Sequence, residues 1–424
     1  MLCQGGMLNH WVGRLLAGLA VAVTFWAAVP TGRAAATSFG TGQLGVLSSV
    51  SAVSASDAWA VGEGTDAVTG AHTTLVLHWN GSTWTMVASP NPGGTIKSGE
   101  SSALDGVSAL SGKDVWAVGS YINPTTLAHE SLVEHWNGSS WSQVPSPNPG
   151  GTASSRSGTN LQAISAVSAK DLWAVGGYLD PATGADQTLI LHGDGKSWTR
   201  ISSASPGGSK RNDLSDLDSV HGLSASNAWA VGEYSTEAKS SGRDAVVLHW
   251  NGTRWARVAS PNALGDSTQR VTNLASVTAV SAHFAMAVGV FSPDSATSPL
   301  ESLTMRWTGS SWVQVASPDP GGIARVSDFT NLSGVSALSA QDAWAVGDDT
   351  DSSSGAVHTV VLHWNGRRWS RFSSPNPSTT RTYLFAVTAP SPQAAWAVGS
   401  YYDGATKSDY TLILRWDGSS WLPA

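Results

Sequence analysis

The sequence predicts an all-β fold, a seven-bladed β-propeller of four-stranded antiparallel blades. The first observation is a motif, Asp57–Gly62, that recurs at 114–119, 171–176, 227–232, 284–289, 342–347 and 394–399. Its central Trp (Met in the fifth copy) recurs at spacings of 57, 57, 56, 57, 58 and 52 residues. The second observation is that each copy is followed by another Trp-containing motif, and the third is the lack of any helical pattern. A fixed period of this size indicates a repeat architecture.

Each repeat begins with two short strands, which the first copy illustrates. Leu47–Val53 alternates apolar and small polar residues, as a half-buried strand does. A tight turn at Ser54–Asp57 leads into a second strand, Trp59–Gly62. A Gly- and Thr-rich loop, Glu63–Ala71, then follows.

Two more strands complete the repeat. Thr73–Trp79 is rich in β-branched and aromatic residues and predicts a third strand. Asn80-Gly81 is the dipeptide favoured in two-residue type I′ hairpins. Trp84–Val87 predicts the fourth strand, which Pro90 ends because proline cannot donate to a ladder. Four strands in each of seven repeats favour a closed propeller; an open solenoid, which would need polar capping repeats, is the alternative.

The second strand predicts how blades pack. Trp59 and Val61 share one face of the strand, and Ala60 and Gly62 share the other. We expect the bulky face of one blade to pack on the small face of the next. Met286 replaces Trp in the fifth blade, which we expect to be the least rigidly packed. Because the last repeat stops soon after Trp421, residues 38–47 are expected to complete the last blade.

Composition limits the function classes. The 424 residues include 12% charged residues and carry a formal charge of −7, with no basic run, which argues against nucleic acid as a partner. The single cysteine, Cys3, lies in the segment that we expect to be removed. The mature chain would then have no disulfide, thiol nucleophile or Cys-bound metal.

The N-terminus predicts export. Arg14, the apolar run 15–29 and the small residues Ala34-Ala35-Ala36 follow the order of a secretory signal peptide, with cleavage after residue 36. Residues 37–424 would form one secreted propeller that is not membrane-bound after cleavage. An uncleaved N-terminal anchor is the alternative.

The repeat resembles the kelch family of propeller blades, such as those of the central domain of galactose oxidase. The shared order is an apolar strand ending near Gly62, a variable loop, a strand ending in Trp79, a tight turn and Trp84. The resemblance covers about residues 44–421 and implies the propeller fold. The copper site of the secreted oxidase uses a Tyr cross-linked to Cys, and the mature chain has no Cys. Gly-Gly, usual after the second strand of kelch blades, occurs only at Gly176-Gly177.

Two sets of repeated polar residues have a structural interpretation. Asp in the turn before the second strand is expected to accept bonds from turn amides; it occurs at Asp57, Asp114, Asp171 and Asp342. Histidines of the third strand lie on different blades and are replaced by Arg306 and Arg415, so a shared metal is not expected.

The candidate ligand-binding residues are aromatic. The position five residues after the second-strand Trp holds Tyr121, Tyr178, Tyr234, Phe291 and Tyr401. Such rings stack on sugars when they lie at the mouth of a ring. The alternative is that they fill the small face beside Ala and Gly.

Two acidic clusters are weak calcium candidates. They are Asp213, Asp216 and Asp218, and Asp348, Asp349 and Asp351. Alternating carboxylates bind calcium in some loops, but neither cluster has the spaced ligand pattern of a calcium loop, so solvated acidic loops are the alternative. No cofactor and no catalytic residue is predicted.

The predicted topology assigns a functional face. Loops joining strands two to three and four to one lie on one face of the ring, and their variation favours a binding role. We expect a secreted, monomeric, non-catalytic propeller that binds a glycan or an extracellular protein there. A carbohydrate-active hydrolase, lyase or oxidase and a purely structural surface protein are the alternatives.

Overall fold

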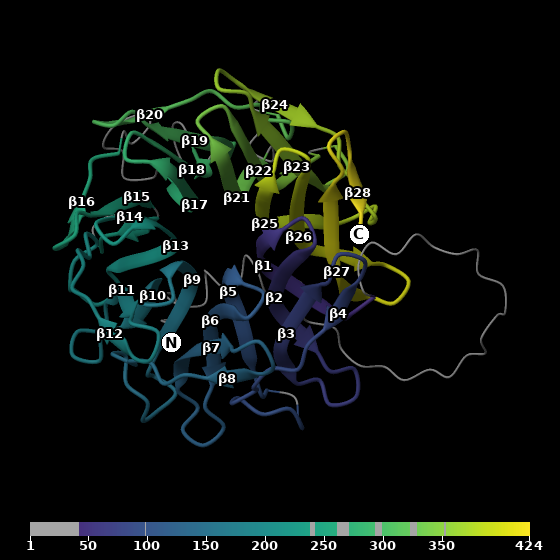
Figure 1. The fold of residues 1–424 in the computed structure, drawn as a ribbon. Coiled ribbons are helices and arrows are strands. Elements are labelled where there is room, and N and C mark those ends of the chain that lie inside the picture. The colour runs from purple at the N-terminus through teal and green to yellow at the C-terminus, as the bar shows by residue number, and fades with distance from the viewer. Residues whose placement is uncertain are drawn as a thin grey trace.

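The structure is a computed structural model that describes residues 42–97, 99–237, 242–260, 271–292, 299–322, 329–351 and 353–424. Within these ranges the chain forms seven four-stranded antiparallel sheets and no helix. The sheets are arranged as blades around a central axis (Figure 1). The predicted signal peptide, residues 1–36, lies outside the described residues. No described segment is a helix long and apolar enough to span a bilayer.

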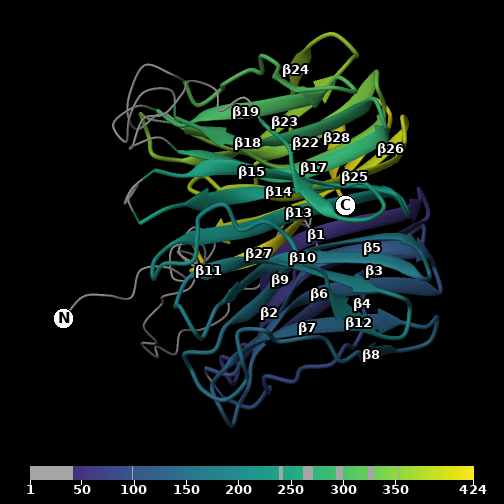
Figure 2. The ribbon, with the colours of Figure 1, turned by 90° about the vertical axis from the view of Figure 1, so that its left-hand side faces the viewer.

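The first strand of each blade lies innermost, because first strands of successive blades contact one another and the last contacts the first. These strands run across the ring from one face to the other (Figure 2). They are β1 (Gly45–Ser54), β5 (Ser102–Ser111), β9 (Thr159–Ser168), β13 (Leu214–Ser224), β17 (Thr272–Ser281), β21 (Phe329–Ser339) and β25 (Thr382–Ser391).

The second strands carry the repeated Trp motif. They are β2 (Asp57–Thr65), β6 (Asp114–Ile122), β10 (Asp171–Leu179), β14 (Asn227–Ser235), β18 (Phe284–Phe291), β22 (Asp342–Thr350) and β26 (Ala394–Asp403).

The third and fourth strands form the outer part of each blade. The third strands are β3 (His72–Trp79), β7 (His129–Trp136), β11 (Asp186–Gly193), β15 (Asp244–Trp250), β19 (Glu301–Trp307), β23 (Val357–Trp364) and β27 (Ser408–Trp416). The fourth are β4 (Trp84–Met86), β8 (Trp141–Gln143), β12 (Trp198–Arg200), β16 (Trp255–Arg257), β20 (Trp312–Gln314), β24 (Trp369–Phe372) and β28 (Trp421–Pro423).

The predicted packing of bulky on small faces is confirmed. Trp59, Val61 and Val76 of the first blade share one buried cluster with apolar side chains of the second, among them Ala117. Trp59 is 1% exposed, and its ring meets that of Trp141 edge-on at 5.6 Å. Seven such clusters, one per interface, form the core. Met286 is fully buried as well; whether its blade is less rigid stays a prediction.

The third-to-fourth turn differs from the predicted two-residue hairpin. Trp79 pairs with Trp84, so the loop has four residues. Gly81 has a φ of 95°, which glycine adopts without strain. The Asn80 side-chain oxygen accepts bonds from the backbone amides of Ser82 and Thr83 at 3.0 Å. Asn-Gly therefore serves as a side-chain-capped turn with a left-handed glycine, and the type I′ interpretation is wrong.

The prediction for the last blade is also wrong. Its fourth strand is β28, from the C-terminal end of the chain, and it is as long as most of its counterparts. Residues from Gly45 onward belong to the first blade instead. The N-terminal segment still touches the last blade, because Leu44 bridges Tyr410 and the Gln43 carbonyl accepts the Thr411 amide at 3.1 Å.

Candidate functional site

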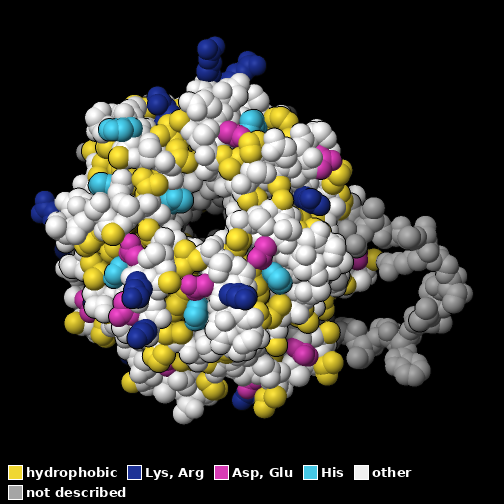
Figure 3. Space-filling model, viewed as in Figure 1, with side chains coloured by type: hydrophobic (Ala, Val, Ile, Leu, Met, Phe, Trp, Pro, Cys, Tyr) yellow, Lys and Arg dark blue, Asp and Glu magenta, His cyan; other side chains and the backbone are white. Residues whose placement is uncertain are grey.

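A cavity of about 660 Å³ occupies the centre of the ring, where the space-filling view is hollow (Figure 3). This volume lies in the range of small-molecule sites, roughly 300–1,000 Å³. Its lining comes from the beginnings of first strands and the ends of second strands. The cavity therefore lies toward the face that carries the two-to-three and four-to-one loops.

A repeated β-bulge aims one residue of each blade into this cavity. In every first strand a leucine pairs with the motif glycine, as Leu47 does with Gly62, and the next residue is skipped in the ladder. Bulges of this kind redirect a side chain and are common beside functional sites. We call the skipped residues the bulge ring: Ser48, Asp105, Gln162, Asp218, Ala275, Ser333 and Phe385, all of which line the cavity.

The bulge ring varies where its neighbours do not. The preceding leucine is the same in all seven blades and is buried in each. The bulge position holds a hydroxyl, a carboxylate, an amide, a methyl group or a phenyl ring. The leucine lies in the interblade core and is constant, whereas the bulge residue lies in the cavity and varies. Packing between blades therefore constrains the leucine but not the bulge residue. The wall of the cavity is consequently asymmetric.

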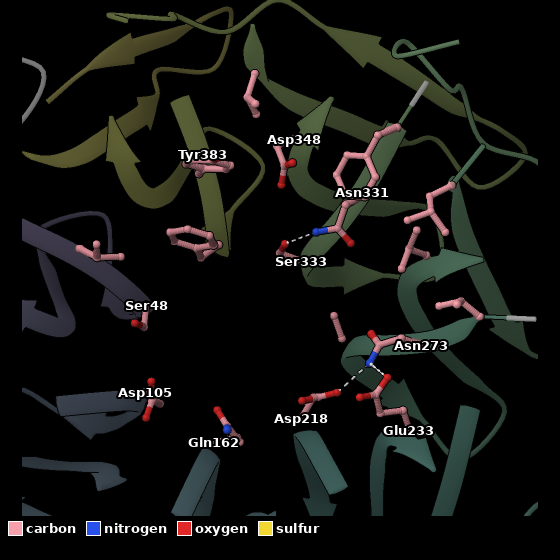
Figure 4. A pocket seen from close by; sticks show the side chains of 18 of the residues that line it. Ser48, Asp105, Gln162, Asp218, Glu233, Asn273, Asn331, Ser333, Asp348 and Tyr383 are labelled. Atoms are coloured by element: carbon pink, nitrogen blue, oxygen red, sulfur yellow. Dashed lines mark hydrogen bonds between the residues drawn. The ribbon is translucent and has the colours of Figure 1, made fainter. Parts of the chain in front are cut away.

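A hydrogen-bonded network forms the wall at blades four and five. The Asn273 side-chain nitrogen donates to Asp218 Oδ2 at 3.0 Å and to Glu233 Oε2 at 3.3 Å. Glu233 also forms an ion pair with Arg243. Because these side chains bind one another, their positions in the wall do not depend on a ligand (Figure 4).

Aromatic rings form the wall at the seventh blade. Tyr383 and Phe385 are two residues apart on β25, with ring centroids 5.9 Å apart and planes inclined by 12°. Asp348 lies nearby on β22, and its charge is one reason that the pKa of Tyr383 is raised, after burial. The two rings are stacked and both line the cavity, and an aromatic ring face suits the face of a sugar ring.

Burial perturbs the carboxyl groups around the cavity. It raises the pKa of Asp348 to about 7, against a hydrogen bond from Asn331 that lowers it. Burial and the charge of Asp218 raise the pKa of Asp216 well above its usual range. Asp216 occupies space beside Gly177, where a Cβ would lie 2.6 Å from its Oδ1. The protonation of Asp348, which lines the cavity, therefore changes near neutral pH.

The structure places the five predicted aromatic residues between blades rather than in the cavity lining. Tyr178 and Phe291 are 8% exposed and belong to interblade clusters, against which Tyr121, Tyr234 and Tyr401 also pack. Tyr121 donates to Glu130 at 2.8 Å, and burial together with that bond raises its pKa to about 12. These contacts fit the packing alternative, and a role in binding stays a prediction.

The two acidic clusters are divided by the fold. Asp218 and Asp348 line the cavity, and Asp216 and Asp349 are buried close to them. Asp213 accepts the Lys210 amide at 2.7 Å. Asp351 accepts the Ser353 amide, and bonds within this turn lower its pKa to about 2. Among the described residues no three acidic, His or Cys side chains are grouped as metal ligands.

The repeated Asp (Asn in blade four) and His residues form pairs within five of the seven blades. Asp57 Oδ1 lies 3.0 Å from His78 Nε2, whose ring stacks on Trp59 at 4.2 Å. The prediction that these carboxylates bind turn amides needs correction, because the serine that ends the first strand binds the turn amide, as Ser54 does for Ser56. The other pairs are Asp114–His135, Asp171–His192, Asn227–His249 and Asp342–His363. This arrangement locks the second strand to the third.

Comparison with known proteins supports the fold. No protein-family model and no curated protein matches the chain. Among solved structures, it is similar to a PL25 ulvan lyase, with 11% identity, a TM-score of 0.54 and coverage of 91% of this chain and 96% of that one. It is also similar to YCF48 bound to D1 peptide, with 13% identity, a TM-score of 0.47 and coverage of 88% and 92%. A third is the Aleuria aurantia lectin with Fucα1-6GlcNAc, with 12% identity, a TM-score of 0.39 and coverage of 78% and 95%.

These neighbours comprise a polysaccharide lyase, a peptide-binding protein and a sugar-binding lectin. At such low identity the likeness establishes a propeller and leaves the ligand open. The kelch family in particular is not established, since no family model matches.

Proposed function

We propose that this chain is a secreted, monomeric, non-catalytic propeller of kelch-type blades that binds a glycan in its central cavity. The observation that carries the proposal is the bulge ring, which directs one side chain from each blade, of five residue types in all, into one cavity. The signal-peptide pattern of residues 1–36 supports export. Ligand binding by some of the solved propellers of similar fold is consistent with this role.

The chemistry of the wall favours a sugar over an apolar ligand. Amide and hydroxyl groups at Asn160, Gln162 and Ser333 match the hydrogen-bonding groups of a saccharide. The rings of Tyr383 and Phe385 supply the flat surface on which a pyranose stacks. An aromatic platform beside fixed polar groups is the usual composition of a specific small-ligand site.

A glycan array followed by isothermal titration with the best oligosaccharide tests this proposal. Tyr383→Ala should weaken binding by about fivefold, because stacking contributes about 1 kcal/mol. Tyr121→Ala is the matched control, since Tyr121 packs between blades and should leave affinity unchanged. If Tyr121→Ala loses binding and Tyr383→Ala does not, the binding site lies at the interblade tyrosines instead of in the cavity. If the protein binds no glycan on the array, a structural role at the cell surface is favoured.

A carbohydrate-active enzyme is the second candidate, and one observation favours it. Asp218 and Glu233 hold oxygens within hydrogen-bond distance of the same Asn273 nitrogen, and paired carboxylates perform glycoside hydrolysis. Incubation of the bound oligosaccharide with wild type and Asp218→Asn distinguishes the two. Chain shortening by wild type that Asp218→Asn abolishes would establish catalysis.

A further inference from the structure

The charge of the cavity wall narrows the ligand class. Five carboxylic acids line the cavity: Glu63, Asp105, Asp218, Glu233 and Asp348. Arg243 is the one Lys or Arg in this lining, and it is paired with Glu233. Asp348, with a pKa of about 7, is largely uncharged at pH 6, and Glu63 is paired with His72. Asp105, Asp218 and Glu233 still outnumber Arg243, and this excess of negative charge repels uronic acids and sulfated sugars and attracts cations.

Three of the five acids, Asp105, Asp218 and Glu233, belong to blades two and four, away from the aromatic rings of blade seven, whereas Glu63 and Asp348 belong to the two blades that flank it. Blades two, three and four contribute Asp105, Gln162 and Asp218 to the bulge ring, and blade seven contributes Phe385. Counted around the ring, blade seven is three blades from blade three and three blades from blade four. Figure 4 shows Asp105, Gln162 and Asp218 on one side of the cavity and Tyr383 on the other. A ligand that fills the space meets an apolar surface on one side and three oxygen acceptors on the other.

We propose that the cavity selects a glycan with free amino groups, such as a glucosamine oligomer. This proposal rests on the proposed function and specifies its ligand. A protonated primary amine carries three donors. Asp105, the Gln162 carbonyl oxygen and Asp218, which also accepts from Asn273, are the acceptors that adjacent blades present to the cavity. The pyranose ring that carries the amine stacks on Tyr383 and Phe385.

The alternative cation is a lysine side chain of a protein partner. The aromatic wall favours the sugar, because the rings of Tyr383 and Phe385 both line the cavity and the face of an aromatic ring suits a pyranose face better than a flexible lysine chain. A lysine-rich peptide is therefore included in the test as a competing ligand.

The test compares hexaglucosamine with its fully N-acetylated form, with cellohexaose and with hexalysine by isothermal titration, at about pH 6, where the amines are protonated. Wild type should bind hexaglucosamine about tenfold more tightly than the acetylated form, because acetylation removes one ion pair per bound sugar. Added salt should reduce this advantage. Asp105→Asn with Asp218→Asn should bring the ratio of the two affinities close to one, because the acceptors that distinguish the free amine are then uncharged.

Glu237→Gln is the control for charge. Glu237 is exposed and does not line the cavity, so its substitution should preserve the preference. Equal binding of the three sugars would overturn the inference about charge while the proposed function stands. Tighter binding of hexalysine would also overturn it, and failure of every sugar, on the array as well, would overturn both proposals.

Discussion

Replacing Glu134 with leucine should stabilise the protein. Glu134 on β7 is fully buried, and both of its carboxyl oxygens lack a hydrogen-bond partner. It shares a face with Leu132, which packs against the first blade. Glu134 pairs with Ala117 of the second strand. In the other six blades the residue at the position of Glu134 is apolar: Leu77, Leu191, Leu248, Met305, Leu362 and Leu414.

The size of the effect follows from ionisation. Burial raises the pKa of Glu134 from 4.5 to about 8. At pH 7 the unfolded chain is ionised there and the folded chain is protonated, so folding costs about 3 kcal/mol, from about 2.5 pH units at about 1.4 kcal/mol each. Because the folded pKa is raised, this penalty is absent below pH 4.5, grows through the interval and is complete above pH 8.

Urea denaturation of wild type and Glu134→Leu at several pH values measures this difference. The gain in free energy of unfolding should increase from acidic to alkaline pH and reach about 3 kcal/mol at neutrality. Leu77→Glu, at the matching position of the first blade, should create a penalty over the same pH interval. Parallel pH profiles for wild type and Glu134→Leu would refute the reasoning, since they would show that the carboxyl ionises as it does in water.

Three further outcomes are expected. Leu127→Gly should stabilise by roughly 0.5–1 kcal/mol in thermal unfolding, because Leu127 has a φ of 60° where blades one, three and six have Gly70, Gly184 and Gly355; an unchanged melting temperature would contradict this. Asp114→Ala should cost about 1 kcal/mol more than Asp57→Ala, because Asp114 also accepts the Trp116 indole at 3.0 Å; equal losses would show that this bond contributes nothing. Amides of β18 should exchange with deuterium faster than those of β2, because Met286 replaces the packing Trp; equal protection would refute the prediction of a looser fifth blade.

The blade architecture could be predicted from sequence because packing forces repetition. Trp59, Ala60 and Val61 fill an interface that recurs seven times, so the same residues recur at a fixed period. The turn at Asn80 was misjudged because the dipeptide is compatible with two turns, and the spacing from Trp79 to Trp84 decides between them. The sequence misleads at the last blade, because only three residues follow Trp421 and the fourth strand therefore looks truncated. Most fourth strands of the structure have only three residues.

The candidate site escaped prediction for the opposite reason. A search for repetition selects Tyr121 and its counterparts, which are repeated because they pack. Ser48, Asp105 and Phe385 share no chemistry, and only the ladder shows that they occupy equivalent bulges. Variation at a fixed distance from the invariant leucine is the signal in the sequence that identifies these positions.

The way the chain closes its circle has a practical consequence for engineering. Every blade is a continuous stretch of sequence, and the first and last blades meet where Leu44 bridges Tyr410 of β27, without exchanging a strand. Linking residue 42 to the C-terminal side of β28 and cutting the chain between any two blades would produce circular permutants that retain every sheet intact. A family of such permutants, each with its seam at a different interface, would show which of the seven junctions yields first under heat or mechanical load.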